Sequence, residues 1–129
     1  MPRPSFDRNI STEKSKSVTE TIYGVCPSKS NCYRIGHKGL FKTKALTDYE
    51  DKFYIQCRNR NKLITGYFSI ELKVFYPNER SDLDNALKVI MDCLQKCKVI
   101  KNDNRCLKII AEKYLDKMNP RIEFTIKEV

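Results

Sequence analysis

One run of strict alternation constrains the fold of this 129-residue chain more than any other feature. Between positions 68 and 76 every second residue is large and apolar, namely Phe68, Ile70, Leu72, Val74 and Tyr76. Side chains of a β-strand point alternately to the two faces of a sheet, so the run predicts a strand with one buried face. A Pro-Asn pair ends it, and an acidic stretch follows directly.

Weaker patterns predict the remaining elements of the same domain. Strands are expected at 18–26, 106–114 and 121–129 from their β-branched and apolar residues. Helical spacing of apolar residues predicts one helix before residue 59 and another over 81–96. The resulting order is β-α-β-α-β-β, which is an α+β single domain with two helices packed on a mixed β-sheet.

The start of the first helix has two possible positions. Thr47 followed three residues later by Glu50 fits a capping box, whereas Thr43 offers an earlier N-cap. Either start gives the same core-facing stripe, formed by Leu46, Tyr49, Phe53 and Cys57.

The N-terminal segment and the composition of the chain indicate its domain organisation and its cellular location. Residues 1–17 are polar and aperiodic and predict a flexible N-terminal arm, followed by one domain over 18–129. No run of 18 apolar residues exists and the N-terminus lacks the apolar segment of a secretory signal. We therefore expect a cytoplasmic chain with no membrane partner.

The six cysteines are expected to be reduced and partly buried, because a cytoplasmic chain rarely forms disulfides. Zinc is the alternative, and it favours closely paired cysteines. Only Cys93 and Cys97 approach that spacing, with His37 near Cys26 and Cys32 as a weaker set.

The net charge of +9 is concentrated in one third of the chain. Residues 27–62 hold nine Lys or Arg and three Asp or Glu. Within this region, residues 29–42 carry two glycines around a turn and alternate basic with aromatic side chains, which predicts a loop or irregular hairpin. Such a segment suits phosphate contacts and stacking on unpaired bases, although its aromatic residues can equally serve to hold the loop on the core.

The acidic stretch after the central strand has the residue types of a metal and phosphate site. Asp82 and Asp84 are two residues apart, Lys88 follows four positions later, and Asp103 lies beyond the helix. Mg²⁺ prefers oxygen ligands, usually one or two carboxylates completed by water and phosphate. Both early aspartates reach one ion only from an extended backbone, so we expect Asp84 at or near the N-cap and the segment 82–84 not yet helical.

Ordinary structural roles also explain the same residues, and on composition and spacing alone they are the simpler interpretation. Asp82 or Asp84 can be a helix cap, and Asp84 with Lys88 can be a surface pair one helical turn apart. Asp103 lies in a Lys-Asn-Asp-Asn-Arg segment, which is typical of a turn.

A wider pattern around these residues favours the functional interpretation. It comprises Asp82-Leu83-Asp84-Asn85, then Lys88, Asp92 and Leu94, then Asp103, and upstream Pro27-Ser28-x-x-Asn31-x-Tyr33-Arg34. Over about residues 20–127 the chain resembles the RusA family of Holliday junction resolvases. Those enzymes are Mg²⁺-dependent endodeoxyribonucleases, often encoded in prophages, that act as homodimers on four-way junctions in DNA recombination and repair.

The resemblance implies specific roles. Asp82, Asp84 and Asp103 would be catalytic metal ligands for Mg²⁺, with Mn²⁺ as a substitute, and Lys88 the essential lysine. No small-molecule cofactor is expected. Contacts to branched DNA would come from a basic and polar set, namely Lys29, Asn31, Tyr33, Arg34, Lys38, Lys42, Lys44 and Arg80.

Two positions depart from the family pattern. Asn102 stands before Asp103 where relatives often have a second aspartate, which weakens catalysis if the metal needs both. The segment before Asp82 holds one positive charge, Arg80, where the family is often strongly basic. A non-catalytic DNA-binding protein on the same scaffold, and a nuclease for flap or RNA substrates, therefore stay as alternatives.

Overall fold

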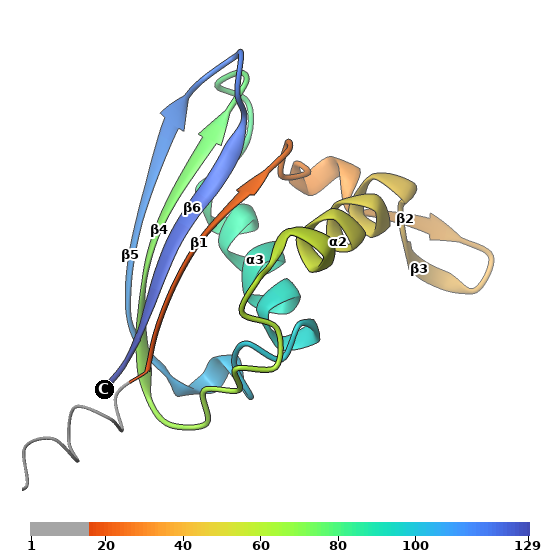
Figure 1. Cartoon of the computed structure of the whole chain (residues 1–129). Coiled ribbons are helices and arrows are strands. Elements are labelled where there is room, and N and C mark those ends of the chain that lie inside the picture. Colours follow the sequence, from red (N-terminus) through yellow and green to blue (C-terminus); the bar gives the residue numbers. More distant parts are fainter. Residues whose placement is uncertain (1–15) are drawn as a thin grey trace, which may run out of the picture.

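A computed structural model describes residues 16–129 as a mixed sheet with helices on one face (Figure 1). Strand order is β1-β6-β4-β5, with β4 and β5 parallel and the other neighbours antiparallel. The α+β class and the predicted element order are confirmed. In chain order the elements are β1 (Ser17–Tyr23), η1 (Lys29–Asn31), β2 (Tyr33–Gly36), β3 (Gly39–Lys42), α2 (Lys44–Gln56), β4 (Phe68–Tyr76), α3 (Leu83–Lys96), η2 (Asp103–Arg105), β5 (Cys106–Leu115) and β6 (Arg121–Glu128).

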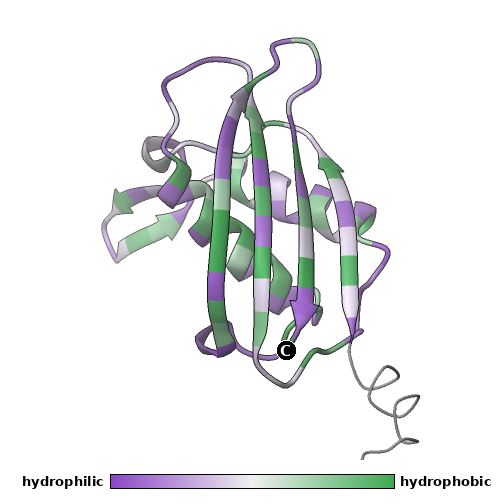
Figure 2. Cartoon of the chain, turned by 90° about the vertical axis from the view of Figure 1, so that its left-hand side faces the viewer, coloured by the Kyte–Doolittle hydropathy of each residue, from purple (hydrophilic) through white to green (hydrophobic). Residues whose placement is uncertain are grey.

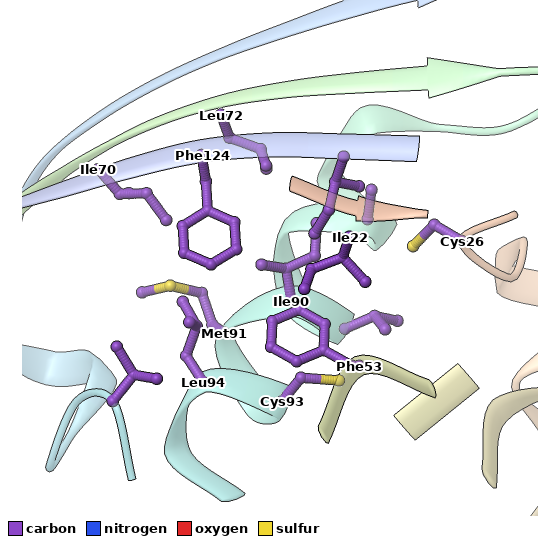
Figure 3. Packing of buried hydrophobic residues seen from close by; sticks show 14 of the residues in the cluster. Ile22, Cys26, Phe53, Ile70, Leu72, Ile90, Met91, Cys93, Leu94 and Phe124 are labelled. Atoms are coloured by element: carbon purple, nitrogen blue, oxygen red, sulfur yellow. The ribbon is translucent and has the colours of Figure 1, made fainter. Parts of the chain in front are cut away.

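The core lies between the sheet and the two α-helices (Figure 3). The five alternating apolar residues of β4 are all buried, as the alternation predicts. Phe53 of α2 stacks on Phe124 of β6 with ring centroids 6.1 Å apart, and Ile90 and Leu94 of α3 are fully buried beside them. Because α3 contributes six buried side chains to this core, its orientation against the sheet is fixed.

The opposite face of the sheet carries no helix among the described residues (Figure 2). Its alternation of polar and apolar side chains is that of a sheet with one solvated face. β5 forms one edge of the sheet. None of the helices within residues 16–129 is both long and apolar enough to span a membrane.

The segment 29–42 folds as the hairpin that the glycines predict. After η1, strands β2 and β3 pair antiparallel as a separate two-stranded sheet that extends away from the main sheet (Figure 1). All eight residues of the two strands are exposed. Tyr33 and Phe41 are 41% and 52% exposed, so neither is buried in the core.

The structure decides where the two α-helices begin. α2 begins after Thr43, whose side chain accepts a hydrogen bond from Leu46 N, so the capping box at Thr47 is wrong. α3 begins at Leu83, with Asp82 extended (φ −94°, ψ 139°) at the N-cap. The expectation that 82–84 is still extended therefore holds at Asp82 alone, and Asp84 lies in the first helical turn.

The cysteines are free thiols, five of them buried and Cys106 partly exposed. Burial raises the pKa of Cys26 to about 12 and also raises the pKa of Cys93. Buried thiols with raised pKa values behave as small apolar residues, as expected. The predicted flexible arm falls almost wholly outside the described residues and stays a prediction; Ser17 already belongs to β1.

Candidate active site

The strand-to-helix junction that carries the aspartates is held by side chains from the sheet. Lys113 of β5 donates hydrogen bonds from Nζ to the carbonyl oxygens of Ser81 (2.9 Å) and Glu79 (3.0 Å). The hydroxyl of the buried Tyr76 lies 3.4 Å from the carbonyl oxygen of Asp82. These contacts fix where α3 begins, and hence where its first turn points.

Asp84, Lys88 and Asp92 form a row along α3, one helical turn apart, as their spacing predicts. This row, here called the α3 row, lines two hollows at once. One hollow faces η2 and β5 and the other faces the hairpin and α2. Asp84 and Lys88 are exposed and Asp92 is half-buried.

The η2 hollow has a volume of about 380 Å³ and is lined by three of the four predicted catalytic residues. Asp84, Lys88 and Asp103 line it, over an apolar floor of Leu87, Met91, Cys106 and Ile109. Asp82, the fourth, is exposed at the N-cap and does not line it.

Asp103 is positioned by two polar side chains that hold its backbone. Its N–H donates to Oε1 of Gln95 at 2.9 Å. Asn102 caps η2 by accepting a hydrogen bond from Asn104 N at 3.2 Å. Asn102, which stands where relatives often have an aspartate, thus has a structural role as a cap, one that an aspartate can also perform.

The hairpin hollow, of about 220 Å³, lies on the other side of the α3 row. Cys32 and Tyr33 line it from the hairpin base, and Glu50 and Leu46 line it from α2. Asn85 ties this wall to α3, because its Nδ2 donates to the carbonyl oxygen of Pro27 at 2.9 Å. The Asn85 that follows Asp84 in the motif therefore anchors the loop that leads into the hairpin.

Among the charged residues that line this hollow, Glu50 forms ion pairs with two lysines. Its carboxylate binds Lys42 Nζ at 2.9 Å and Lys96 Nζ at 3.1 Å. Partial burial alone would raise the pKa of Glu50, but hydrogen bonds from the two lysines outweigh it and lower the pKa below the usual value. Lys42, a predicted DNA contact, is thereby engaged within the protein.

The aspartates lack the ordinary roles that would explain them structurally. Asp82 occupies the N-cap, yet its side chain makes no capping hydrogen bond. Asp84 and Lys88 form no ion pair with each other or with any other of residues 16–129, and the carboxylate of Asp84 accepts only from its neighbour Asn85 N. Their charges are therefore available to a ligand.

The three expected metal ligands do not converge in this conformation. Within residues 16–129 no three Asp, Glu, His or Cys side chains lie close enough together to hold a metal ion. The geometry of α3 explains this. Asp84 lies in the first turn of the helix, whereas the backbone of Asp103 is hydrogen-bonded to Gln95 in the last turn. Residues 84 and 95 are separated by roughly 16 Å along the helix axis.

The predicted DNA contacts divide into three groups. Asn31 and Arg80 line a further hollow together, whose wall includes the loop after β1. Lys42 and Lys44 are paired, to Glu50 and Asp48. Tyr33, Arg34 and Lys38 are exposed on the hairpin. The side chain of Lys29 lies outside the described part of the structure.

Four residues of the site were not assigned to it from the sequence. Asp92 carried a signal, because it continues the row of Asp84 and Lys88 at i+8. Gln95, Glu50 and Lys113 carried none, since each acts through a contact with a distant segment.

Comparison with known proteins identifies the class as DNA endonucleases. The family model described as "Endodeoxyribonuclease RusA" matches residues 25–127. The crossover junction endodeoxyribonuclease RusA of Aquifex aeolicus is 35% identical over 94 residues, which cover 69% of this chain and 74% of that protein. This chain therefore belongs to the RusA family of endodeoxyribonucleases, as its motifs predict.

Proposed function

We propose that this protein is a Mg²⁺-dependent endonuclease that resolves four-way or other branched DNA by phosphodiester hydrolysis, in DNA recombination and repair. Membership of the RusA family supports the nuclease activity, and the relative's printed name supports the crossover junction as substrate. The observation that carries the site assignment is the α3 row, whose exposed Asp84 and Lys88 have no ionic partner among residues 16–129.

The donor set suits magnesium. Asp82, Asp84 and Asp103 present exposed carboxylate oxygens, which Mg²⁺ and Mn²⁺ both accept, and Mg²⁺ needs only one or two of them besides water and phosphate. Because the three carboxylates do not converge in this conformation, Asp84 and Asp103 would hold one ion only when the walls of the η2 hollow move closer together, and Asp82 would add to them from the N-cap. When bound, the metal lowers the pKa of an attacking water and stabilises charge on the phosphate.

The protein's own residues then have distinct tasks. Lys88, between the two aspartates of the α3 row, stabilises negative charge that develops on the phosphate. Gln95 holds Asp103 in register with α3. Arg34 and Lys38 on the hairpin, with Arg80 beside Asn31, bind phosphates on either side of the site.

The open edge of the sheet supports a homodimer. β5 ends the sheet, and it exposes five apolar side chains in ten residues: Leu107, Ile109, Ile110, Tyr114 and Leu115. An unpaired apolar edge is a template for pairing with another chain. Because β5 carries mixed charges, with Lys108, Glu112 and Lys113, a second copy suits it better than DNA does.

Sedimentation of Ile110→Lys tests this interface. A charge on the edge strand is expected to shift the protein from dimer to monomer, whereas Thr21→Lys on β1, the other edge, leaves the dimer intact. A wild-type protein that sediments as a monomer in the presence of junction DNA would contradict the dimer.

The decisive experiment for the function is cleavage of a synthetic four-way junction with Mg²⁺ by wild type and by Asp84→Asn. Linear duplex, flap and RNA substrates of the same sequences run beside it. Wild type should nick the junction fastest, and the variant should bind it without nicking. Equal activity of the two proteins would exclude this site, and equal rates on all DNA substrates would exclude the junction as the preferred one.

A non-catalytic DNA-binding protein is the second candidate, favoured by the lack of a three-ligand cluster among residues 16–129. It predicts salt-sensitive DNA binding that survives loss of all three aspartates, and no cleavage in Mg²⁺ or Mn²⁺.

A further inference from the structure

The hairpin has a surface that phosphate binding does not explain. Ile35 and Leu40 are 85% and 72% exposed, and they are directly paired across β2 and β3 next to the turn. Isolated exposed apolar residues need no explanation, but a cross-strand pair at the end of a projecting hairpin forms a single apolar tip. The hairpin as a whole extends away from the main sheet (Figure 1).

The apolar tip lies on the same face of the hairpin as the site. Side chains alternate along a strand, so Tyr33 and Ile35 share one face of β2, and Leu40 and Lys42 continue it on β3. At the base of this face, Tyr33 lines the hairpin hollow with Asp84 and Lys88. A strand of DNA held at Asp84 and Lys88 that followed the hairpin outward would therefore meet Tyr33 first and the apolar tip next.

Contacts within the hairpin and at its base hold the tip in place. On the opposite face, the ring of Phe41 packs against Gly36 so closely that an added Cβ would be 2.9 Å from it. Gly39 adopts φ +104° to close the turn. At the base, Lys42 is tied to Glu50 of α2 at 2.9 Å. These contacts hold the hairpin, and hence the apolar tip, in a defined position relative to α2.

The charge around the tip indicates what it contacts. Residues 29–44 contain five Lys or Arg and no Asp or Glu. Basic side chains that flank an apolar pair are unfavourable for packing against an equally basic second copy, and they are complementary to a nucleic acid backbone. Proteins that deform DNA insert apolar side chains, Ile and Leu among them, between base steps and partially unstack the bases.

We propose that Ile35 and Leu40 form a wedge that enters branched DNA where base stacking is interrupted, and so direct the nuclease to the branch point. This role rests on the proposed cleavage of branched DNA. Unstacking a continuous duplex is costly, whereas a branch point already offers base faces at lower cost. The wedge therefore favours branched over linear DNA without reading sequence.

The test uses Asp84→Asn protein, which is expected to bind without cutting, and a junction with 2-aminopurine at its centre. Binding should raise the fluorescence, because an unstacked 2-aminopurine is brighter. Adding Ile35→Ser and Leu40→Ser should abolish the rise and weaken junction binding by roughly tenfold, as expected when apolar side chains lose their burial against base faces. Binding to linear duplex should change less than twofold. The matched control is Ile55→Ser with Met118→Ser, which removes apolar side chains that are 74% and 90% exposed elsewhere.

Three outcomes for the Ile35→Ser, Leu40→Ser variant would overturn the wedge. In the first, junction binding and fluorescence stay unchanged; in the second, binding to junction and to linear duplex falls equally. In the third, the variant changes from dimer to monomer in sedimentation, which would assign the tip to contact with a second copy. Each of these outcomes is distinct from failure of the proposed function. That function fails if the wild-type protein cuts no branched DNA, or if Asp84→Asn cuts it as well as wild type does.

Discussion

Glu50 and Asp84 line the same hollow but differ in their ion pairs. Glu50 binds two lysines at 2.9 and 3.1 Å, and its pKa is lowered by them. Asp84 has no ionic partner among residues 16–129, although Lys88 is one helical turn away. A paired carboxylate stabilises the fold, whereas an unpaired one beside an unpaired lysine is available to an external ligand.

The two sides of the α3 row repeat this difference. On the hairpin side, Asn85 ties α3 to the loop after β1, and Glu50 of α2 binds both Lys96 of α3 and Lys42 of β3. On the η2 side, Asp84, Lys88 and Asp103 surround a hollow with an apolar floor and make no ion pair within the described residues. Substitutions on the two sides are therefore expected to affect different properties.

After the loss of cleavage expected for Asp84→Asn, the largest effect is expected for Lys88→Met, which removes the charge and keeps much of the side-chain length. Junction cleavage should fall on the order of 100-fold, because a donor to the developing charge is lost. The free energy of unfolding should change by less than about 0.5 kcal/mol, as for exposed residues without partners. Rates from single-turnover cleavage and a urea melt check the two parts, and a destabilisation above that range would mean that Lys88 is structural.

A smaller effect is expected for Gln95→Ala, because Gln95 acts through Asp103. Cleavage should fall roughly tenfold and the Mg²⁺ concentration needed for half-maximal rate should rise, as for residues that orient metal ligands. Gln56→Ala is the matched control, since Gln56 also bonds a backbone, that of Tyr23, at 2.8 and 2.9 Å, but away from the site.

If Gln95→Ala and Gln56→Ala lower cleavage equally with no change in the Mg²⁺ requirement, Gln95 does not position a metal ligand. A luminescence titration with Tb³⁺ gives a second measure of ion binding that is independent of cleavage.

The smallest effect on cleavage is expected for Glu50→Gln. The unfolding free energy should fall by about 1 kcal/mol from the loss of two charge-assisted hydrogen bonds, and cleavage should change less than twofold. Because the pKa of Glu50 is lower in the folded protein, its stabilisation is complete above the ordinary value of 4.5 and is lost as the pH falls through the folded value. The difference between wild type and variant in urea melts should therefore shrink below about pH 4.5.

The sequence predicts the elements of this fold better than their arrangement. Periodicity identifies β4 and α3 because burial imposes a period on every residue of each element. It does not reveal that β6 lies between β1 and β4, since that order depends on pairing between distant segments. The spacing that predicts a helix over 81–96 locates α3 to within two residues, because it begins at Leu83 after an extended Asp82. The expectation of an extended Asp84, which follows from the metal site and not from the spacing, is wrong because Asp84 lies in a regular first turn.

The site divides in the same way. The spacing on one helix places Asp84, Lys88 and Asp92 in one row, although only Asp84 and Lys88 are predicted as site residues, and Asp103 follows from the family pattern. Glu50, Gln95 and Lys113 act across long sequence separations, so only the fold reveals them.

The most direct test measures junction cleavage and unfolding free energy for Asp84→Asn and Glu50→Gln in parallel. Asp84→Asn should lose cleavage and keep its stability, while Glu50→Gln should keep cleavage and lose stability. If both substitutions change the two properties together, the division between an available and a structural carboxylate is wrong, and with it the assignment of the α3 row as the active site.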